Sequence, residues 1–340
     1  MNIRIKDICR FGKKSDIKAG EGNTKGKYMF FTSSIDKDKR IDKFDYDEEG
    51  IIMGTGGNAT LHYYSGKFAV STDCLVLLPN SSYKCKYLYY FFLHNMRVLE
   101  GGFRGAGLKH TSKSYIENIE LTKTHSLLEQ DKIISVLSNI DNTIVLQNKR
   151  LKLINELTRS LFIEMFGDPI NNSKNLPTTK LIDVVMLQRG YDLPINERAH
   201  DGNIPVFGSN GILGYHNKSK VVGGGVITGR SGSIGSVYYT KEDYWPLNTS
   251  LFSVKLNGNN IVFIAYLLKF FDLSRFADGT GVPTLNRNII HDKQIINVIQ
   301  SEQNRFAEYV SSIDKSKLAV KKSLEELEIL KKSLMQKYFA

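Results

Sequence analysis

The sequence lacks the features of a membrane or secreted protein. It contains no apolar run of about 18 or more residues, the length that a membrane-spanning helix needs. The first residues, MNIRIKDICRFGKK, have no apolar segment, so no secretory signal is expected. Only three cysteines occur, Cys9, Cys74 and Cys85, and none stands in a CxxC pair. Three thiols cannot all pair with one another, so we expect buried, reduced cysteines in a cytoplasmic protein.

Signatures of catalysis and of metal binding are also missing. An enzyme that methylates an amino group of a base would show an Asn/Asp-Pro-Pro-Tyr/Phe loop, but no two of the seven prolines are adjacent. The seven histidines form no HExxH pair, and the cysteines form no zinc-binding pattern. We therefore expect no catalytic residue, no metal site and no cofactor in this chain.

What the chain does have is positive charge. It carries 46 Lys and Arg against 35 Asp and Glu, a formal charge of +11. Such an excess favours partners rich in phosphate, because each neutralised phosphate releases counterions. A length of 340 residues, with 41% hydrophobic and 24% charged residues, is typical of a soluble protein with about two folded domains.

The most informative feature is an internal repeat. Residues 129–166 align with residues 302–339 without a gap, at an offset of 173. Upstream, GIIMGTGGNATLHYY (50–64) aligns with GVITGRSGSIGSVYY (225–239) at an offset of 175. FFTSS (30–34) aligns with VFGSN (206–210), and RGAGLKHTS (104–112) aligns with DGTGVPTLN (278–286). The chain is thus a duplication of one structural unit.

The glycine-rich part of this repeat resembles a phosphate-binding P-loop, Gly224-x-x-x-x-Gly229-Arg230-Ser231, with Arg in place of Lys. The first copy has Thr55 in place of Arg230, and the residues that follow, SIGSVYYT, alternate as in a strand. A P-loop would open a helix instead. We interpret the segment as strand-turn-strand that either approaches a ligand closely or forms a plain structural hairpin.

Residues 129–166 and 302–339 are predicted to form two long helices. Apolar residues recur at alternating steps of four and three, and neither segment contains Gly or Pro. At about 1.5 Å per residue such a helix extends roughly 57 Å. Both copies are polar at one seam position, Thr158 and Lys331. The predicted helix-pairing seam comprises Ile133, Leu137, Ile140, Ile144, Leu151, Ile154, Leu161, Phe306, Val310, Ile313, Val320, Leu324, Leu327 and Leu334.

The simplest arrangement packs the two helices against each other as an antiparallel coiled coil. The globular units would then lie at opposite ends, related by a pseudo-twofold axis. The alternative is that each helix folds back on its own unit. We expect an α/β (α+β) fold in each unit, with residues 1–125 and 168–300 forming the globular domains. Residues 126–167 and 301–340 would form the two helices.

These motifs together resemble the specificity subunit of Type I restriction–modification systems, over essentially the whole chain. The resemblance rests on Glu129-Gln130-x-x-Ile133 with its echo Glu302-Gln303, and on MFGDP (165–169). It rests further on VFGSNGILGY (206–215), VITGRSGSIG (226–235) and GTGVPTLNRNII (279–290). The chain is short for that family. In addition, the segment FFTSSIDKDK of the first copy differs from FGSNGILGYH of the second copy.

The resemblance implies that each unit is a target-recognition domain for one half of a split sequence in double-stranded DNA. The half-sites would lie about 34–36 Å apart or near that spacing. The helices would dock two methyltransferase (M) subunits, and restriction/translocase (R) subunits would join them. S-adenosylmethionine, ATP and Mg would then be bound by these partner subunits.

Polar and cationic residues in the repeated loops are the candidate DNA contacts, because such side chains bind base edges and phosphates. Each of them could equally be a solvated loop residue or form a bond within a turn. Arg230 and Lys109 stand out as cations in glycine-flanked motifs. The candidates are Ser34, Thr55, Asn58, Arg104, Lys109 and His110 in the first copy, and Asn210, Thr228, Arg230, Ser231, Asn286 and Arg287 in the second.

Two other functions remain open from the residues alone. A duplicated scaffold could bind protein in place of DNA, and its binding would then depend little on salt. A DNA modification enzyme would need an active site that the sequence does not reveal. The aromatic run Tyr87 to Phe92 and Trp245 could stack on bases, but their setting predicts buried core residues.

Overall fold

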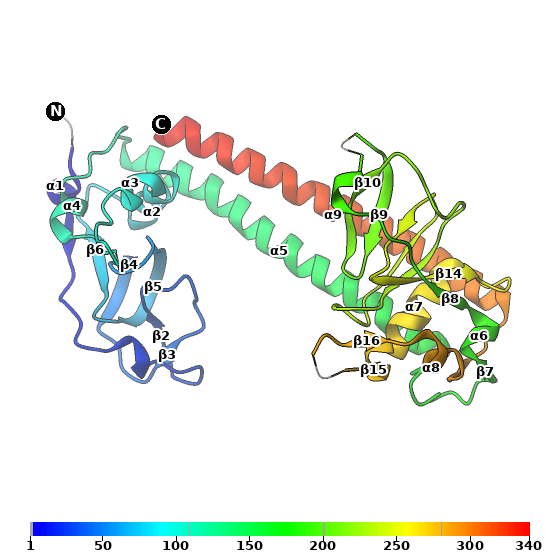
Figure 1. Ribbon diagram of the computed structural model, residues 1–340. Coiled ribbons are helices and arrows are strands. Elements are labelled where there is room, and N and C mark those ends of the chain that lie inside the picture. The colour runs from blue at the N-terminus through cyan, green and yellow to red at the C-terminus, as the bar shows by residue number, and fades with distance from the viewer. Residues whose placement is uncertain (1–2, 108, 200, 280) are drawn as a thin grey trace. The chain divides into compact units, whose positions relative to one another are not determined.

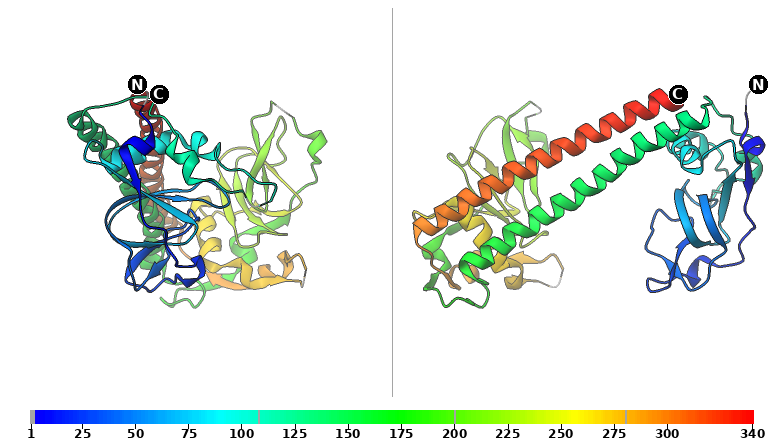
Figure 2. Two further views of the ribbon diagram at one scale, coloured as in Figure 1. Left: turned by 90° about the vertical axis from the view of Figure 1, so that its left-hand side faces the viewer. Right: turned by 180° about the vertical axis from the view of Figure 1, so that it is seen from behind.

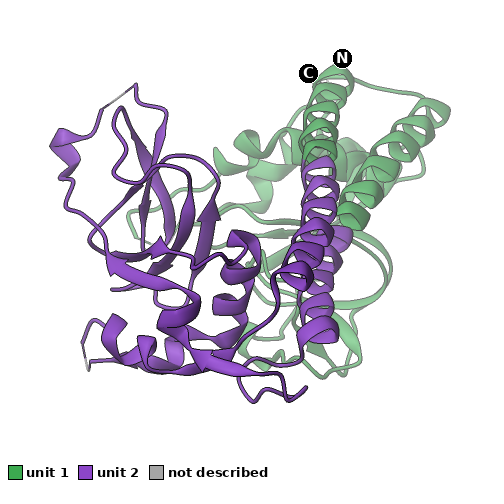
Figure 3. Cartoon of the chain, turned by 90° about the vertical axis from the view of Figure 1, so that its right-hand side faces the viewer, with its two compact units in different colours: residues 1–148, 322–340 green, residues 149–321 purple. Residues whose placement is uncertain are grey.

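The computed structural model describes residues 3–107, 109–199, 201–279 and 281–340. The chain forms two compact units, which are coloured separately in Figure 3. Unit 1 comprises Met1–Asn148 and Lys322–Ala340, and unit 2 comprises Lys149–Lys321. Each unit therefore contains a globular part and a portion of both long helices. The domain limits expected from the sequence, at residues 125, 167 and 300, stay a prediction.

Unit 1 is built on one mixed sheet of six strands in the order β1-β6-β4-β5-β2-β3. Strands β4 and β5 pair antiparallel over eight residue pairs, whereas β2 joins β5 in parallel. The strands are β1 (Cys9–Phe11), β2 (Tyr28–Phe31), β3 (Arg40–Ile41), β4 (Tyr46–Gly54), β5 (Leu61–Val70) and β6 (Cys74–Pro79).

Helix α2 covers this sheet against β4 and β5 (Figure 1). Its aromatic residues Tyr87, Tyr90, Phe91 and Phe92 are buried, which confirms that the aromatic run forms core. The run ends at Asn95, where the backbone leaves the helical region and a second short helix begins. The helices of this globular part are α1 (Ile5–Ile8), η1 (Ala19–Glu21), α2 (Cys85–His94), α3 (Met96–Glu100) and α4 (Lys113–Glu117).

Unit 2 divides its strands among four smaller sheets. The largest has the order β12-β11-β14-β8, and a three-stranded sheet has the order β10-β9-β13. Two-stranded pairs are formed by β15 with β16 and by β17 with β7. The strands are β7 (Thr178–Lys180), β8 (Met186–Arg189), β9 (Ile204–Gly208), β10 (Gly211–His216), β11 (Gly225–Gly229), β12 (Val237–Thr240), β13 (Trp245–Pro246), β14 (Ser250–Lys255), β15 (Ala277–Asp278), β16 (Thr284–Leu285) and β17 (Gln294–Ile296).

Helix α7 is the counterpart of α2 and packs on β11 and β12. Eight of its eleven residues are buried, because they face the sheet on one side and the long helices on the other. Trp245 is also a core residue, packed with Leu193, Val206 and Leu247, as expected. The helices are α6 (Leu181–Val184), η2 (Ile195–Glu197), α7 (Ile261–Phe271), η3 (Leu273–Phe276) and α8 (Arg287–His291).

The glycine-rich segment forms an antiparallel strand pair. Strand β11 pairs with β12 from Gly225 opposite Thr240 to Thr228 opposite Val237, and no helix follows Arg230. At Gly229 an added Cβ would lie 1.9 Å from the carbonyl oxygen of Ser233, so only glycine fits there. The strand-turn-strand interpretation is confirmed, and a P-loop is excluded.

The two long helices are α5 (Leu127–Phe166) and α9 (Gln300–Phe339), within two residues of the expected bounds. In unit 1, Asp141 of α5 forms an ion pair with Lys331 of α9 at 2.6 Å. In unit 2, Phe162 near the end of α5 packs on Phe306 near the start of α9, with ring centres 5.4 Å apart. The helices therefore run side by side in opposite directions (Figure 2), which confirms the antiparallel pair.

All residues of the predicted helix-pairing seam are buried or half-buried. Ile133 and Leu137 join the core of unit 1, while Phe306 and Val310 join the core of unit 2. The placement of the globular parts at opposite ends, with a pseudo-twofold axis, stays a prediction. None of the helices in the described ranges is apolar over enough residues to span a membrane.

Candidate nucleic-acid interface

A polar groove of about 740 Å³ opens on the surface of unit 2. Three chain segments meet there: the end of β8 with the residues after it, the residue after β11, and β16 with the start of α8. Its lining residues are Gln188, Arg189, Gly190, Tyr191, Asp192, Arg230, Leu251, Thr284, Leu285, Asn286 and Arg287.

Backbone hydrogen bonds fix these segments against one another. The Arg230 N–H donates to the carbonyl of Thr249 at 2.9 Å, and the Arg230 carbonyl accepts from the Leu285 N–H at 2.8 Å. Gly190 N–H donates to the carbonyl of Ser250 at 3.1 Å. The sheet β12-β11-β14-β8 therefore holds the groove in place, and the lining side chains project from a rigid backbone.

Arg230 is the most constrained cation of the groove. Its guanidinium donates from Nη1 to the carbonyl of Asn248 at 3.3 Å, and the residue is half-buried. A guanidinium has five N–H donors, so this single bond leaves donors for a ligand. The anchoring bond reduces the rotamer freedom that the side chain would lose on binding.

The groove is electropositive. Arg189, Arg230 and Arg287 face one carboxylate, that of Asp192, which accepts a hydrogen bond from the amide of Asn248. Among the residues that the structure describes, none of the three arginines forms an ion pair. Their charges are therefore not neutralised within the chain, and they favour a phosphate-rich partner.

Three predicted residues of the second copy, Arg230, Asn286 and Arg287, lie in this groove. Asn286 is also the N-cap of α8, where its Oδ1 accepts from the Asn288 N–H at 3.0 Å. Ser231 is half-buried beside Thr284, to which it is bridged, and Asn210 is exposed after β9. Thr228 is fully buried in β11, so its hydroxyl does not reach the surface.

The first copy brings five of its predicted residues together. The Arg104 and His110 backbones exchange two hydrogen bonds of 2.9 Å, and Gly57 N–H donates to the carbonyl of Lys109 at 2.9 Å. The Thr111 N–H donates to the Thr55 carbonyl at 3.0 Å, which joins the same two loops. Asn58 lies in the first loop and is exposed, as are Arg104, Lys109 and His110.

Ser34 belongs to the neighbouring loop. Ser33 Oγ and Thr55 Oγ1 both donate to the carbonyl of Asp73, at 2.6 and 3.0 Å, which ties that loop to the cluster. The Ser34 carbonyl accepts from Nε2 of His62 at 2.9 Å. Burial lowers the pKa of His62, so its ring is held neutral.

Reasoning from the sequence did not name the other eight lining residues, among them Gln188, Arg189, Tyr191 and Asp192. The signal was present, because Ser15-Asp16-Ile17 aligns with Tyr191-Asp192-Leu193 at an offset of 176, an extension of the repeat. Tyr191 carries Lys220 over its ring at 5.5 Å, and the same ammonium lies 5.0 Å from the ring centre of Trp245.

The described residues contain no cluster of three or more His, Cys, Asp or Glu side chains that could hold a metal ion. His200 lies outside the described residues. The three cysteines are free and buried, as expected, and burial raises the pKa of the Cys9 thiol to about 12.

Comparison with known proteins gives one consistent family. The family model described as Type I restriction modification DNA specificity domain matches residues 1–156 and 174–329. The Type I restriction enzyme MjaVIII specificity subunit of Methanocaldococcus jannaschii is 22% identical, over 98% of this chain and 90% of its own. A putative type I specificity subunit of Mycoplasma genitalium is 23% identical, over 95% of this chain and 91% of its own.

Solved structures show the same fold. The crystal structure of the Type-I restriction-modification system S subunit from M. genitalium has a TM-score of 0.74 at 17% identity, over 100% of this chain and 96% of that chain. A structure from a study of complex assembly and conformational transition of the type I R-M system has a TM-score of 0.60 at 12% identity, over 100% and 97% of the two chains.

Proposed function

This chain belongs to the Type I restriction modification DNA specificity domain family, and from that premise we propose which of its residues read DNA. Unit 2 reads one tract of a bipartite target through the groove around Arg230. Unit 1 reads the other tract through the cluster of Thr55, Arg104, Lys109 and His110. The chain serves as the specificity subunit of the complex.

The observation that carries this proposal is the set of three unpaired arginines in the groove of unit 2. Arginine binds the O6 and N7 edge of guanine with two parallel hydrogen bonds, the commonest specific contact in DNA recognition. Arg230, which is anchored to Asn248, suits that role because its position is fixed. Exposed Arg287 at the start of α8 and exposed Arg189 suit phosphate contacts, which position the protein without reading sequence.

The first copy presents a different surface. Thr55 stands where the second copy has Arg230, and its hydroxyl is engaged by the carbonyl of Asp73. The exposed cationic side chains of this cluster are those of Arg104 and Lys109. We therefore expect the two units to read different base sequences.

We infer that the chemistry is carried by other subunits. The sequence has no Asn/Asp-Pro-Pro loop for methyl transfer, and no other active-site motif. Methyl transfer would use S-adenosylmethionine in the methyltransferase subunits, and cleavage would use ATP and Mg in the restriction subunits. This chain would supply only the recognition of the DNA sequence.

Exposed apolar residues support docking of two copies of one partner. Val145 of α5 and Leu318 of α9 are equivalent in the repeat and are 65% and 70% exposed. Leu157 and Leu330 form a second equivalent pair and are 53% and 47% exposed. Apolar side chains left in water at repeated positions favour two equivalent contacts, as two methyltransferase subunits would make.

The substitution Arg230→Ala in the assembled complex tests this proposal. We expect recognition of one tract to weaken or relax by about 1–3 kcal/mol, because the contacts to one base pair are lost. The other tract should be unchanged. Sequencing of methylated sites reports both tracts at once.

Arg305→Ala is the matched control, since it removes the same charge from unit 2 on the exposed surface of α9, outside the groove. Equal relaxation of both tracts by Arg230→Ala would contradict the assignment. Binding that changes little with salt would favour the protein scaffold over a DNA reader.

A further inference from the structure

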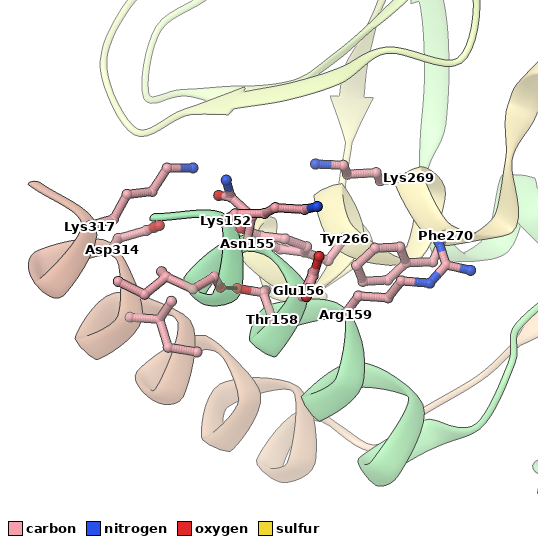
Figure 4. A pocket seen from close by; sticks show the side chains of 12 residues that line it. Lys152, Asn155, Glu156, Thr158, Arg159, Tyr266, Lys269, Phe270, Asp314 and Lys317 are labelled. Carbon is pink, nitrogen blue, oxygen red and sulfur yellow. Dashed lines mark hydrogen bonds between the residues drawn. The ribbon is translucent and has the colours of Figure 1, made fainter. Parts of the chain in front are cut away.

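A second pocket of unit 2, of about 410 Å³, lies between α5, α7 and α9 (Figure 4). It shares no residue with the DNA-reading groove. The side chains of Lys152, Lys269 and Lys317 come from three different helices and border the same opening, as Figure 4 shows. Elements far apart in the sequence thus bring several cations to one cavity.

The pocket has an excess of positive charge. Four cations line it, the three lysines and Arg159, together with two carboxylates, Glu156 and Asp314. Within the described chain none of these six groups forms an ion pair. Arg159 lies over the ring of Phe270 at 5.5 Å and Lys269 over that of Tyr266 at 5.8 Å, so the walls are aromatic where the cations rest.

The repeat shows what occupies the equivalent place in unit 1. There Lys331 of α9, the counterpart of Thr158, reaches Asp141 of α5 at 2.6 Å. The chain therefore fills that place with its own ion pair. In unit 2 the shorter Thr158 does not reach Asp314, and the cavity remains beside it.

Unit 1 has no lysine at the positions that correspond to the three lysines of the pocket. Lys152 of unit 2 corresponds to Glu325 of unit 1, and Lys317 corresponds to Ile144. The remaining lysine, Lys269, corresponds to Leu93 at the offset of 176 that aligns α7 with α2. The cluster of lysines is thus a property of unit 2 alone, and partner docking that treats the two units alike does not account for it.

We propose that this pocket binds a multiply charged anion of the phosphate class, either a free polyphosphate or the phosphate tail of a nucleotide. Phosphate oxygens accept several charge-assisted hydrogen bonds at once, which matches ammonium groups arriving from three helices. The carboxylate of Asp314 opposes an anion, but it is hydrogen-bonded by the Tyr239 hydroxyl at 3.2 Å and is outnumbered. The bound anion would link α5, α7 and α9 in unit 2, where unit 1 has Lys331 and Asp141.

Calorimetric titration of the full chain with tripolyphosphate at low salt tests the proposal. The double variant Lys152→Glu/Lys317→Ile places the residues of unit 1 in the pocket of unit 2, so both residue types are tolerated at the equivalent helix positions. We expect its affinity to fall about tenfold or more, because two charge-assisted contacts are lost. Arg305→Ala, which removes a cation of unit 2 that lines neither this pocket nor the groove, should leave the affinity unchanged.

Titrations with ATP and with tripolyphosphate distinguish the two sources, since a nucleotide site binds ATP more tightly. Lys269→Leu, again the residue of unit 1, serves as a second variant if the double variant unfolds. No binding of either anion at about 1 mM, or equal binding by wild type and pocket variants, would overturn the proposal. So would pocket variants that weaken duplex DNA binding and leave anion binding intact, because the occupant would then be DNA.

Discussion

Each long helix is joined to its globular part by one buried glutamine. Gln130 accepts the Lys84 N–H at 2.8 Å and donates to the carbonyls of Ser82 and His125, at 3.2 and 2.9 Å. Gln303 repeats the pattern, accepting the Asn260 N–H at 2.8 Å. The Gln130 side chain fixes the backbone just before α2, and the Gln303 side chain fixes the backbone just before α7. These hydrogen bonds orient each long helix at its start.

The substitution Gln130→Ala should destabilise unit 1 by about 1–3 kcal/mol, because it removes three hydrogen bonds from a partly buried N–H and two carbonyls. Urea unfolding followed by circular dichroism measures this loss. Asn142→Ala, at an exposed position of the same helix, is the control and should shift the midpoint little. A Gln130→Ala midpoint equal to the control would refute the joining role.

His62 makes unit 1 sensitive to acid. It is 2% exposed, its Nε2 donates to the Ser34 carbonyl, and its Nδ1 has no hydrogen-bond partner among the residues that the structure describes. Burial lowers its pKa below the ordinary value of 6.5. Above that value both folded and unfolded states are neutral, so the stability is fully present; below it the unfolded state takes up the proton more readily and stability falls.

We therefore expect the urea midpoint to fall between about pH 7.5 and about pH 5.5, and to fall less in the variant His62→Gln. Part of the dependence should remain, because burial also lowers the pKa of His94 and His291. An unchanged pH dependence in His62→Gln would show that the protonation of this ring is not coupled to folding.

The sequence identifies important residues more reliably than it identifies the contacts that those residues make. Gln130 and Asp141 recur in the repeat, but their partners Lys84 and Tyr90 lie 46 and 51 residues away and could not be inferred from spacing. Thr228 was expected to contact DNA, yet it is buried, because all five residues of β11 are covered on both faces. Asn286 carries a capping signal that the sequence does contain, an Asn directly before a helical run.

The helix pair is stabilised differently along its length. In unit 1 the pair is linked by Lys331 and Asp141, whose side chains are 24% and 33% exposed. The Tyr90 hydroxyl also donates to Asp141 at 2.8 Å and connects this ion pair to the globular core. In unit 2 the aromatic residues Phe162, Phe166 and Phe306 hold the helices together.

Replacing Lys331 by Thr, the residue of the other copy, should destabilise unit 1 by roughly 1–2 kcal/mol. The reason is that Asp141 loses its partner in a half-buried setting, where screening by water is incomplete. Thermal unfolding of Lys331→Thr and of Lys331→Arg measures it, since Arg keeps the charge. If both variants melt at the wild-type temperature, the ion pair contributes nothing.

The helices could be predicted from the sequence because a 3.5-residue repeat persists over many turns without Gly or Pro. The sheets could not be predicted in the same way. Strand β2 pairs in parallel with β5, more than 30 residues later, and β13 pairs in parallel with β9. Such non-local pairings depend on the packing of the whole unit, which short alternating runs do not encode.

The two copies of the duplicated unit have diverged in structure. Both units keep the same element order, from a short helix through strands β4 or β11 to the globular helix and the long helix. Their sheets differ, since unit 1 has one sheet of six strands and unit 2 has four smaller ones. The shared elements carry the fold, while the variable loops carry the candidate DNA contacts.

In the function that we propose, each unit reads its own tract of DNA. Sequencing of the sites methylated by complexes that contain the wild-type chain, Arg230→Ala or Lys109→Ala tests it most directly. We expect the wild type to require two separate tracts, and each variant to relax a different one by about 1–3 kcal/mol per lost contact. A single continuous tract, or relaxation of the same tract by both variants, would contradict the account.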